Sequence, residues 1–125
     1  MLSQTAAILK DIPLPKMVPV AQHFPHNGIP DLRAVLRETL DQPHIKSLVQ
    51  PGMRICITCG SRGVANSLVI AQELVAFVKA RGADPFIIPA MGSHGGATAE
   101  GQRAVLAGFG ITQERCGCPI LSSME

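Results

Sequence analysis

The sequence predicts an α/β fold in which a parallel sheet has helices on both of its faces. Three observations support this prediction: strand-like and helix-like segments alternate between residues 53 and 125, glycine-rich loops link strands to helices, and the second strand is apolar throughout. A continuously apolar strand is typical of a parallel sheet, because both of its faces are buried. The alternation corresponds to a right-handed half-unit of a doubly wound, Rossmann-like sheet.

The first part of the chain is expected to contain a leader and the start of the domain. Residues 1–30 are rich in proline and are predicted to form an extended leader that lies against another surface. The α/β domain itself is expected to span residues 31–125. Its first helix runs from Asp31, the predicted N-cap, to about Asp41, because apolar residues recur there at helical spacing. Pro43 ends this helix, and a short second helical piece follows it.

Two strand–loop–helix units follow in the sequence. Residues 53–58 and 85–90 are the predicted strands, because these short apolar runs rich in β-branched residues are bounded by turn residues. Asn66 and Thr98 are the predicted N-caps of the helices that follow the strands. Residues 119–124 are expected to form a third strand. Because the chain stops on that strand, we expect it to be the N-terminal part of a larger, two-domain protein.

Composition excludes several classes of function. The chain has four Phe and no Trp or Tyr, too few aromatic residues for a protein that stacks the bases of single-stranded nucleic acid. Its net charge of +2 is too small for a protein that binds the phosphate backbone of a nucleic acid. No segment has the pattern of a signal peptide, and no run approaches the roughly 20 apolar residues of a membrane helix. We therefore expect a cytoplasmic protein without a nucleic-acid or membrane partner, in which the four cysteines are reduced thiols or metal ligands rather than disulfides.

Two glycine-rich loops at strand ends form the predicted ligand site. Ligands of an open parallel sheet bind at the carboxyl ends of its strands, beside helix N-termini whose amides favour anions. Arg62 in the first loop offers a planar fork for a carboxylate or phosphate, and His94 in the second can take and return a proton. Neither loop has the spacing of a standard phosphate motif, so the pattern by itself predicts only an anion-binding domain. The glycines that would let a ligand approach the backbone are Gly60, Gly63, Gly92, Gly95 and Gly96.

The stretch from Gly60 to Met124 resembles the N-terminal domain of the nickel-dependent lactate racemase family. The resembling segments are GSRGVAN at residues 60–66, PFIIPAMGSHGGATAEGQ at 85–102 and PILSSME at 119–125. The resemblance implies that the full-length protein is an isomerase, a racemase or epimerase of 2-hydroxy acids. Its reaction would proceed by hydride transfer to a nickel-pincer nucleotide, and the fragment alone would be inactive.

The resemblance also implies a role for individual residues. His94 corresponds to the catalytic histidine of the first domain, Arg62 to the arginine that holds the substrate carboxylate, and Ser61 to the hydroxyl position of that motif. The tethering lysine, the nickel ligand and the second catalytic histidine of the family are expected outside this chain. The family's Asp-x-Thr-Arg-Pro is replaced here by CGSRG, which leaves the substrate and the cofactor contacts open. The expected cofactor contacts are Gly60, Gly63, Gly92, Ser93, Gly95 and Gly96.

A non-catalytic module that binds an anion or zinc is the alternative function. Cys56 and Cys59 in a CxxCG pattern resemble half of a structural zinc site, and Cys116 and Cys118 form a second pair. Residues three apart in a regular strand face opposite sides, so the first pair is not expected to share a metal. We therefore predict buried free thiols and no metal ligand in this chain. The expected partners are a small 2-hydroxy acid and the C-terminal domain of the same protein, with a homo-oligomer through an exposed face left open.

Overall fold

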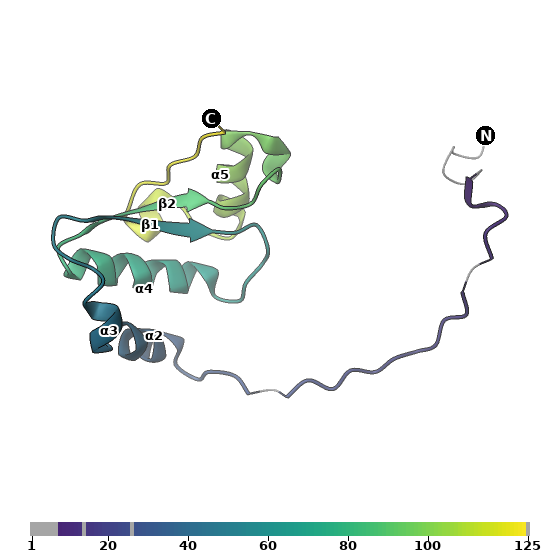
Figure 1. The fold of residues 1–125 in the computed structure, drawn as a ribbon, viewed down its shortest axis with the longest axis horizontal. Coiled ribbons are helices and arrows are strands. Elements are labelled where there is room, and N and C mark those ends of the chain that lie inside the picture. The colour runs from purple at the N-terminus through teal and green to yellow at the C-terminus, as the bar shows by residue number, and fades with distance from the viewer. Residues whose placement is uncertain (1–7, 14, 26, 125) are drawn as a thin grey trace.

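The computed structural model describes residues 8–13, 15–25 and 27–124. At its centre, strands β1 (Arg54–Cys59) and β2 (Asp84–Pro89) pair in parallel. Figure 1 shows both strands pointing the same way above a long helix, with the N-terminal segment extending away from them. The chain is therefore a mixed α/β structure built around a small parallel sheet.

A third segment borders the sheet on the far side of β2. Helix α4 (Ser67–Ala80) connects β1 to β2, whose register places Ile57 opposite Ile87. A parallel bridge joins Ile87 to Ile120. Both backbone groups of Ile87 bond to the segment around Ile120, so that segment lies on the edge of β2 opposite β1.

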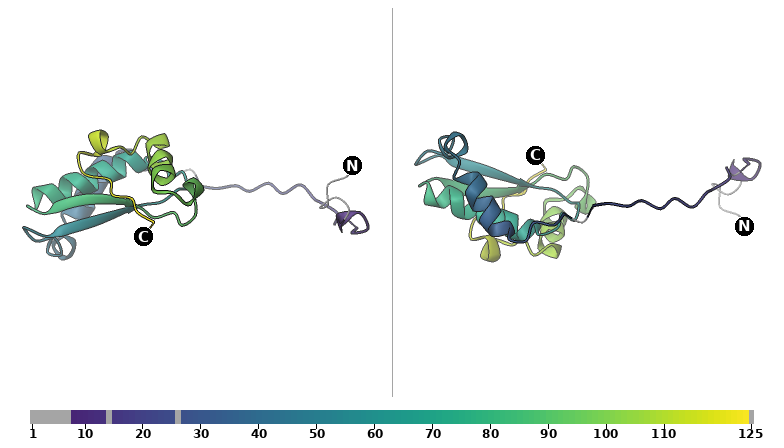
Figure 2. Two further views of the ribbon diagram at one scale, coloured as in Figure 1. Left: turned by 90° about the horizontal axis from the view of Figure 1, so that it is seen from above. Right: turned by 90° about the horizontal axis from the view of Figure 1, so that it is seen from below.

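The hydrophobic core lies on one face of the sheet. Helices α4, α5 (Ala99–Gly108) and α6 (Gln113–Cys116) gather on that side of the strands (Figure 2). The opposite face exposes Cys56 and Thr58, and no helix covers it in the part of the chain that the structure describes. The predicted helices on both faces are thus seen on one face only. The core consists of Ile57, Ala71, Val75, Ile87, Met91, Leu106, Ile111, Cys116 and Cys118.

The C-terminal region differs most from the sequence prediction. Residues 119–124 were expected to form a strand, but their ladder is limited to the single bridge at Ile120. Pro119 lacks an N–H group, so it cannot extend the ladder as a donor. Helix α6 was not predicted, because its four residues are too few to show a helical period; Thr112 caps it and Gly117 ends it at a φ of 73°.

The first N-terminal helix confirms its predicted boundaries, whereas the second, expected to run through Ile45 to Val49, already ends at Lys46. Helix α2 (Leu32–Leu40) begins after Asp31, whose carboxylate accepts a 2.9 Å hydrogen bond from the Ala34 amide. This bond satisfies one of the donors that a helix leaves free at its start. Helix α3 (Pro43–Lys46) has proline at its first position, where the missing N–H costs nothing.

The predicted leader is extended over most of its described length, but residues 8–12 form a helical turn in which the Ile12 amide donates a 3.2 Å hydrogen bond to the Leu9 carbonyl. Residues 15–25 and 27–29 have no regular secondary structure and are exposed, and they run away from the domain in Figure 1. Positions 1–7, 14 and 26 of the predicted leader lie outside the described residues. Within the described ranges, no helix is both long and apolar enough to cross a bilayer.

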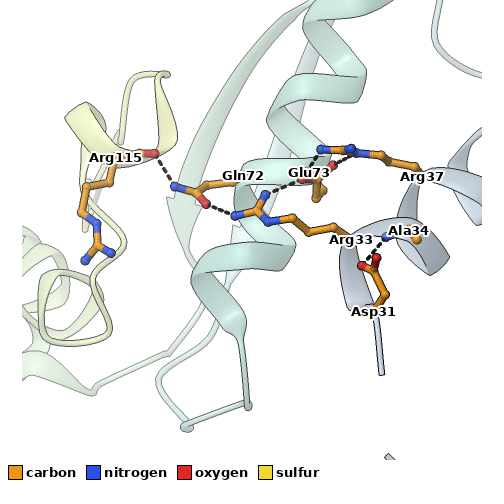
Figure 3. Close-up of polar contacts among 7 residues, drawn as sticks. All are labelled: Asp31, Arg33, Ala34, Arg37, Gln72, Glu73 and Arg115. Carbon is orange, nitrogen blue, oxygen red and sulfur yellow. Dashed lines mark hydrogen bonds and ion pairs between the residues drawn. The ribbon is translucent and has the colours of Figure 1, made fainter. Parts of the chain in front are cut away.

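A polar network fastens α2 to α4 (Figure 3). Glu73 on α4 accepts hydrogen bonds from Arg33 and from Arg37, whose Nε lies 2.7 Å from Oε2. The side chain of Glu73 is only 5% exposed, because the two arginine side chains cover it. Gln72 accepts a bond from Arg33 and donates one to the carbonyl of Arg115, which extends the network to α6. The bonds from Arg37 are the main reason that the pKa of Glu73 lies below its ordinary value.

Replacing Glu73 by Gln is expected to lower the free energy of unfolding by about 1–2 kcal/mol at neutral pH, because the charge-assisted bonds are lost. The arginines are largely exposed, and solvent screening keeps the effect from being larger. Since folding lowers the pKa of Glu73, its stabilisation is complete above the ordinary pKa of 4.5 and disappears as the pH falls through the lowered value.

Denaturant unfolding of both proteins from neutral to acidic pH tests this expectation. The difference between wild type and Glu73→Gln should shrink steadily below the ordinary carboxyl pKa. Glu100→Gln is the matched control, because that carboxylate is 80% exposed in its ion pair and should contribute little. If the difference in free energy of unfolding stays constant with pH, the charge of Glu73 does not contribute to the stability of the protein.

Candidate functional site

The two glycine-rich loops leave the sheet at the same edge. Cys59 and Pro89 are partners in the strand register, and the Ala90 amide donates a 2.8 Å hydrogen bond to the Cys59 carbonyl beyond the end of β2. The loops that follow, at residues 60–66 and 90–98, therefore begin side by side. Figure 1 shows the two arrowheads at one end of the sheet.

A hydrogen bond between side chains joins the two loops. Ser61 Oγ bonds to Nδ1 of His94, although the two residues are 33 positions apart in the sequence. Either the serine hydroxyl donates to Nδ1, or a protonated Nδ1 donates to Oγ. In the second arrangement Nε2 of His94 is a free acceptor, and Ser61 fixes the orientation of the ring. Both arrangements give a histidine with a defined orientation at the strand ends.

The loop that holds His94 is packed tightly onto helix α5. It includes the short 3₁₀ turn η1 (Gly95–Ala97), which begins directly after His94. Gly95 has a φ of +66°, and a Cβ there would lie 2.5 Å from the carbonyl carbon of Gly101 on α5. The side-chain amide of the buried Gln102 donates a 2.7 Å hydrogen bond through Nε2 to the carbonyl of Gly92. The position of His94 is therefore set by contacts between its loop and α5.

A cavity of about 550 Å³ opens beside the pair of loops. Ser61, Arg62 and His94 all line it, together with Ser67 at the start of α4. This volume lies within the usual range of roughly 300–1,000 Å³ for small-molecule sites. Apolar side chains form most of the remaining wall: Ile57, Val64, Ile70, Ala71, Leu74, Ala90, Met91, Phe109 and Ile111.

Arg62 is available to a ligand. Its side chain is exposed, and it makes no hydrogen bond or ion pair with any residue that the structure describes. The glycines of the two loops have open space at their own α-carbons: a Cβ added at Gly92 or Gly96 would meet no atom within 4 Å, and one at Gly60 would lie 3.9 Å from the Ala90 carbonyl oxygen. An anion can thus approach the guanidinium without displacing a partner.

The structure brings some of the predicted site residues together and separates others. Gly60, Ser61, Arg62 and His94 share the cavity wall. The remaining predicted contacts lie in the same two loops but do not line the cavity, and their role in cofactor binding stays a prediction: Gly63, Gly92, Ser93, Gly95 and Gly96.

Sequence reasoning missed the apolar wall of the cavity. Phe109, the C-cap of α5, and Ile111 reach the strand ends only because the chain turns back after that helix. Ile70 and Leu74 belong to the apolar stripe of α4, which predicts burial but cannot distinguish a core from a cavity wall. The same stripe predicts Leu68, Val75 and Val78 to be core; Val75 and Val78 are buried, and Leu68 is half-buried against the core.

The four cysteines are free thiols and do not form a metal centre. Cys56 was expected to be buried but is exposed, because it lies on the face of β1 opposite the core. Cys116 and Cys118 are buried in the core, and Cys59 packs against it. Burial raises the pKa of Cys59, Cys116 and Cys118, which disfavours the thiolate that a metal needs. No group of three or more His, Cys, Asp or Glu within residues 8–13, 15–25 and 27–124 is placed to hold a metal ion. By themselves, the residues described here do not fit the metal of a nickel-pincer nucleotide.

Comparisons with known proteins do not identify the chain. No family model, no curated protein and no solved structure matches it. The functional interpretation therefore depends on the geometry of the loops and on their sequence motifs.

Proposed function

We propose that this domain binds a 2-hydroxy carboxylate at Ser61, Arg62 and His94, and provides the proton-transfer group of a 2-hydroxy-acid racemase or epimerase. The observation that supports the proposal most directly is the hydrogen bond between Ser61 and His94 on the wall of a cavity that Arg62 also lines. The resemblance of both loops to the nickel-dependent lactate racemase family supports the class of reaction.

Each side chain has a distinct task in this proposal. The planar guanidinium of Arg62 binds the carboxylate through two parallel hydrogen bonds, which fixes the orientation of the acid. Nε2 of His94 then accepts the proton of the C2 hydroxyl and later returns it. Ser61 accepts the Nδ1–H of His94, so it holds the ring and stabilises the imidazolium that forms.

The rest of the enzyme belongs to the same proposal. In the resembling family a nickel-pincer nucleotide supplies the hydride acceptor, and the residues that would hold its metal lie outside this chain. The sheet would be completed to a Rossmann-like layer with helices on both faces, and a second domain would close the site. The free thiols suit a reducing compartment, so we place the enzyme in the cytoplasm.

Replacing Arg62 by Ala is expected to weaken the binding of a 2-hydroxy carboxylate by at least tenfold. Hydrogen bonds between charged groups contribute about 1.5–3 kcal/mol, which corresponds to roughly 10–150-fold in affinity. Titration of the isotopically labelled chain with lactate, followed by NMR, measures the dissociation constant. Arg62→Lys should give an intermediate affinity, because the ammonium keeps the charge but loses the planar fork.

Arg103→Ala is the matched control for this titration. Arg103 is an exposed arginine on α5 that pairs with Glu100 and does not line the cavity. Its removal should leave lactate binding unchanged. If Arg62→Ala binds lactate as well as the wild type does, the carboxylate site is not at Arg62. Phosphate that binds at Arg62 more tightly than any hydroxy acid would favour the non-catalytic anion-binding module instead.

A further inference from the structure

The polar and apolar parts of the cavity are separated. Ser61, Arg62 and His94 come from the two loops at the strand ends. The wall provided by α4 and by the segment after α5 is apolar, with Ile70, Leu74, Phe109 and Ile111 among its residues. A ligand held by its carboxylate in the polar part therefore has an apolar surface beside it.

The apolar wall is accessible rather than filled. Ile70 and Leu74 lie one turn apart on α4, so their side chains share a face of that helix. Both are half-buried, as is Phe109, whose ring lies 3.9 Å from the place that a Cβ on Gly63 would occupy. All three line the cavity, so an apolar ligand group there would remove part of their exposed surface from water.

We propose that this wall binds a bulky apolar substituent at C2, so that the preferred ligand is a hydroxy acid larger than lactate, such as one with an isobutyl group. The inference rests on the proposed function for the placement of the carboxylate on Arg62. A methyl group covers little of a wall built from Ile70, Leu74 and Phe109. A second carboxylate or a chain of hydroxyls would lose its hydration there without gaining a partner.

Titration of the labelled chain with three acids tests the inference: 2-hydroxy-4-methylpentanoate, lactate and malate. Each CH₂ group removed from water improves affinity roughly fourfold. The isobutyl acid has three more carbons than lactate, but the cavity is open and removes only part of their surface from water. We therefore expect the isobutyl acid to bind at least tenfold more tightly than lactate. Malate, with a charged substituent, should bind no better than lactate.

Substitutions on α4 make the test specific to the wall. Ile70→Ser should reduce the preference for the isobutyl acid at least threefold and leave lactate binding unchanged, whereas Ile70→Val should keep the preference. Val69→Ser is the matched control, because Val69 is a half-buried neighbour on the same helix that does not line the cavity. The amide spectrum of each variant shows whether it is folded.

The possible results separate this inference from the proposed function. If all three acids bind equally and Arg62→Ala abolishes their binding, the apolar subsite is overturned and the carboxylate site stands. If 2-hydroxy-4-methylpentanamide, which lacks the carboxylate, binds as tightly as the acid, the cavity is apolar but the role of Arg62 is wrong. An isobutyl preference that survives Ile70→Ser would also overturn the inference.

Discussion

A Gly101→Ala variant is expected to lose about 3 kcal/mol of its free energy of unfolding, although alanine is the better helix former. A Cβ on Gly101 would overlap the carbonyl oxygen of Gly95 and lie 2.7 Å from its carbonyl carbon. Both atoms belong to the backbone, so no side chain can rotate away. The His94 loop would have to separate from α5 to admit the methyl group.

Gly108→Ala on the same helix is the matched control. A Cβ at Gly108 meets no atom within 4 Å, so the change should be neutral or stabilise the protein by up to about 1 kcal/mol. Denaturant unfolding of the two variants measures both effects. Equal stability of the two variants would show that the His94 loop can move away from α5 at little cost in free energy. The position of His94 would then be less constrained than the contacts of its loop indicate.

Local chemistry explains why the strands and most helix starts were predictable. β1 and β2 lie within one residue of their predicted limits, because apolar runs between turn residues specify a strand without reference to distant parts of the chain. The Thr98 hydroxyl accepts the Gly101 amide at 3.0 Å, as a predicted N-cap should. Asn66 occupies the predicted N-cap position of α4, but its side chain makes no capping bond and its φ is +61°.

The features that sequence reasoning missed depend on contacts between distant segments. Residues 119–124 were expected to pair along a neighbouring strand, but only Ile120 bridges to β2, at Ile87. Phe109 enters the cavity wall through the turn after α5, where no motif marks a ligand site.

The candidate site was predictable to the level of its loops. Parallel strands bring their carboxyl ends together, which predicts that Arg62 and His94 lie near each other but not which side chains meet. The register of β1 and β2 decides that Ser61 is the partner of His94. Gly95 was expected to approach a ligand, and the structure shows that its packing on Gly101 already requires glycine.

Replacing His94 by Ala is expected to reduce the rate of C2 epimerisation by at least about 100-fold, the lower range of a positioned general base. The assay uses the longer protein of the proposal, supplied with the proposed nickel-pincer nucleotide, and chiral chromatography follows the two enantiomers of a 2-hydroxy acid. Because the proposed mechanism has His94 act on the hydroxyl proton and Arg62 on the carboxylate, kcat should fall while KM changes little.

Two further variants separate catalysis from positioning. Ser61→Ala should lower kcat about tenfold, because the imidazole keeps its chemistry but loses the hydrogen bond that orients it. Ser61→Thr should recover much of this loss, since threonine retains the hydroxyl. His44→Ala, at an exposed position on α3, should have no effect. Full activity in His94→Ala would remove His94 from the reaction, whereas a large loss with unchanged substrate affinity would place the proton transfer on its ring.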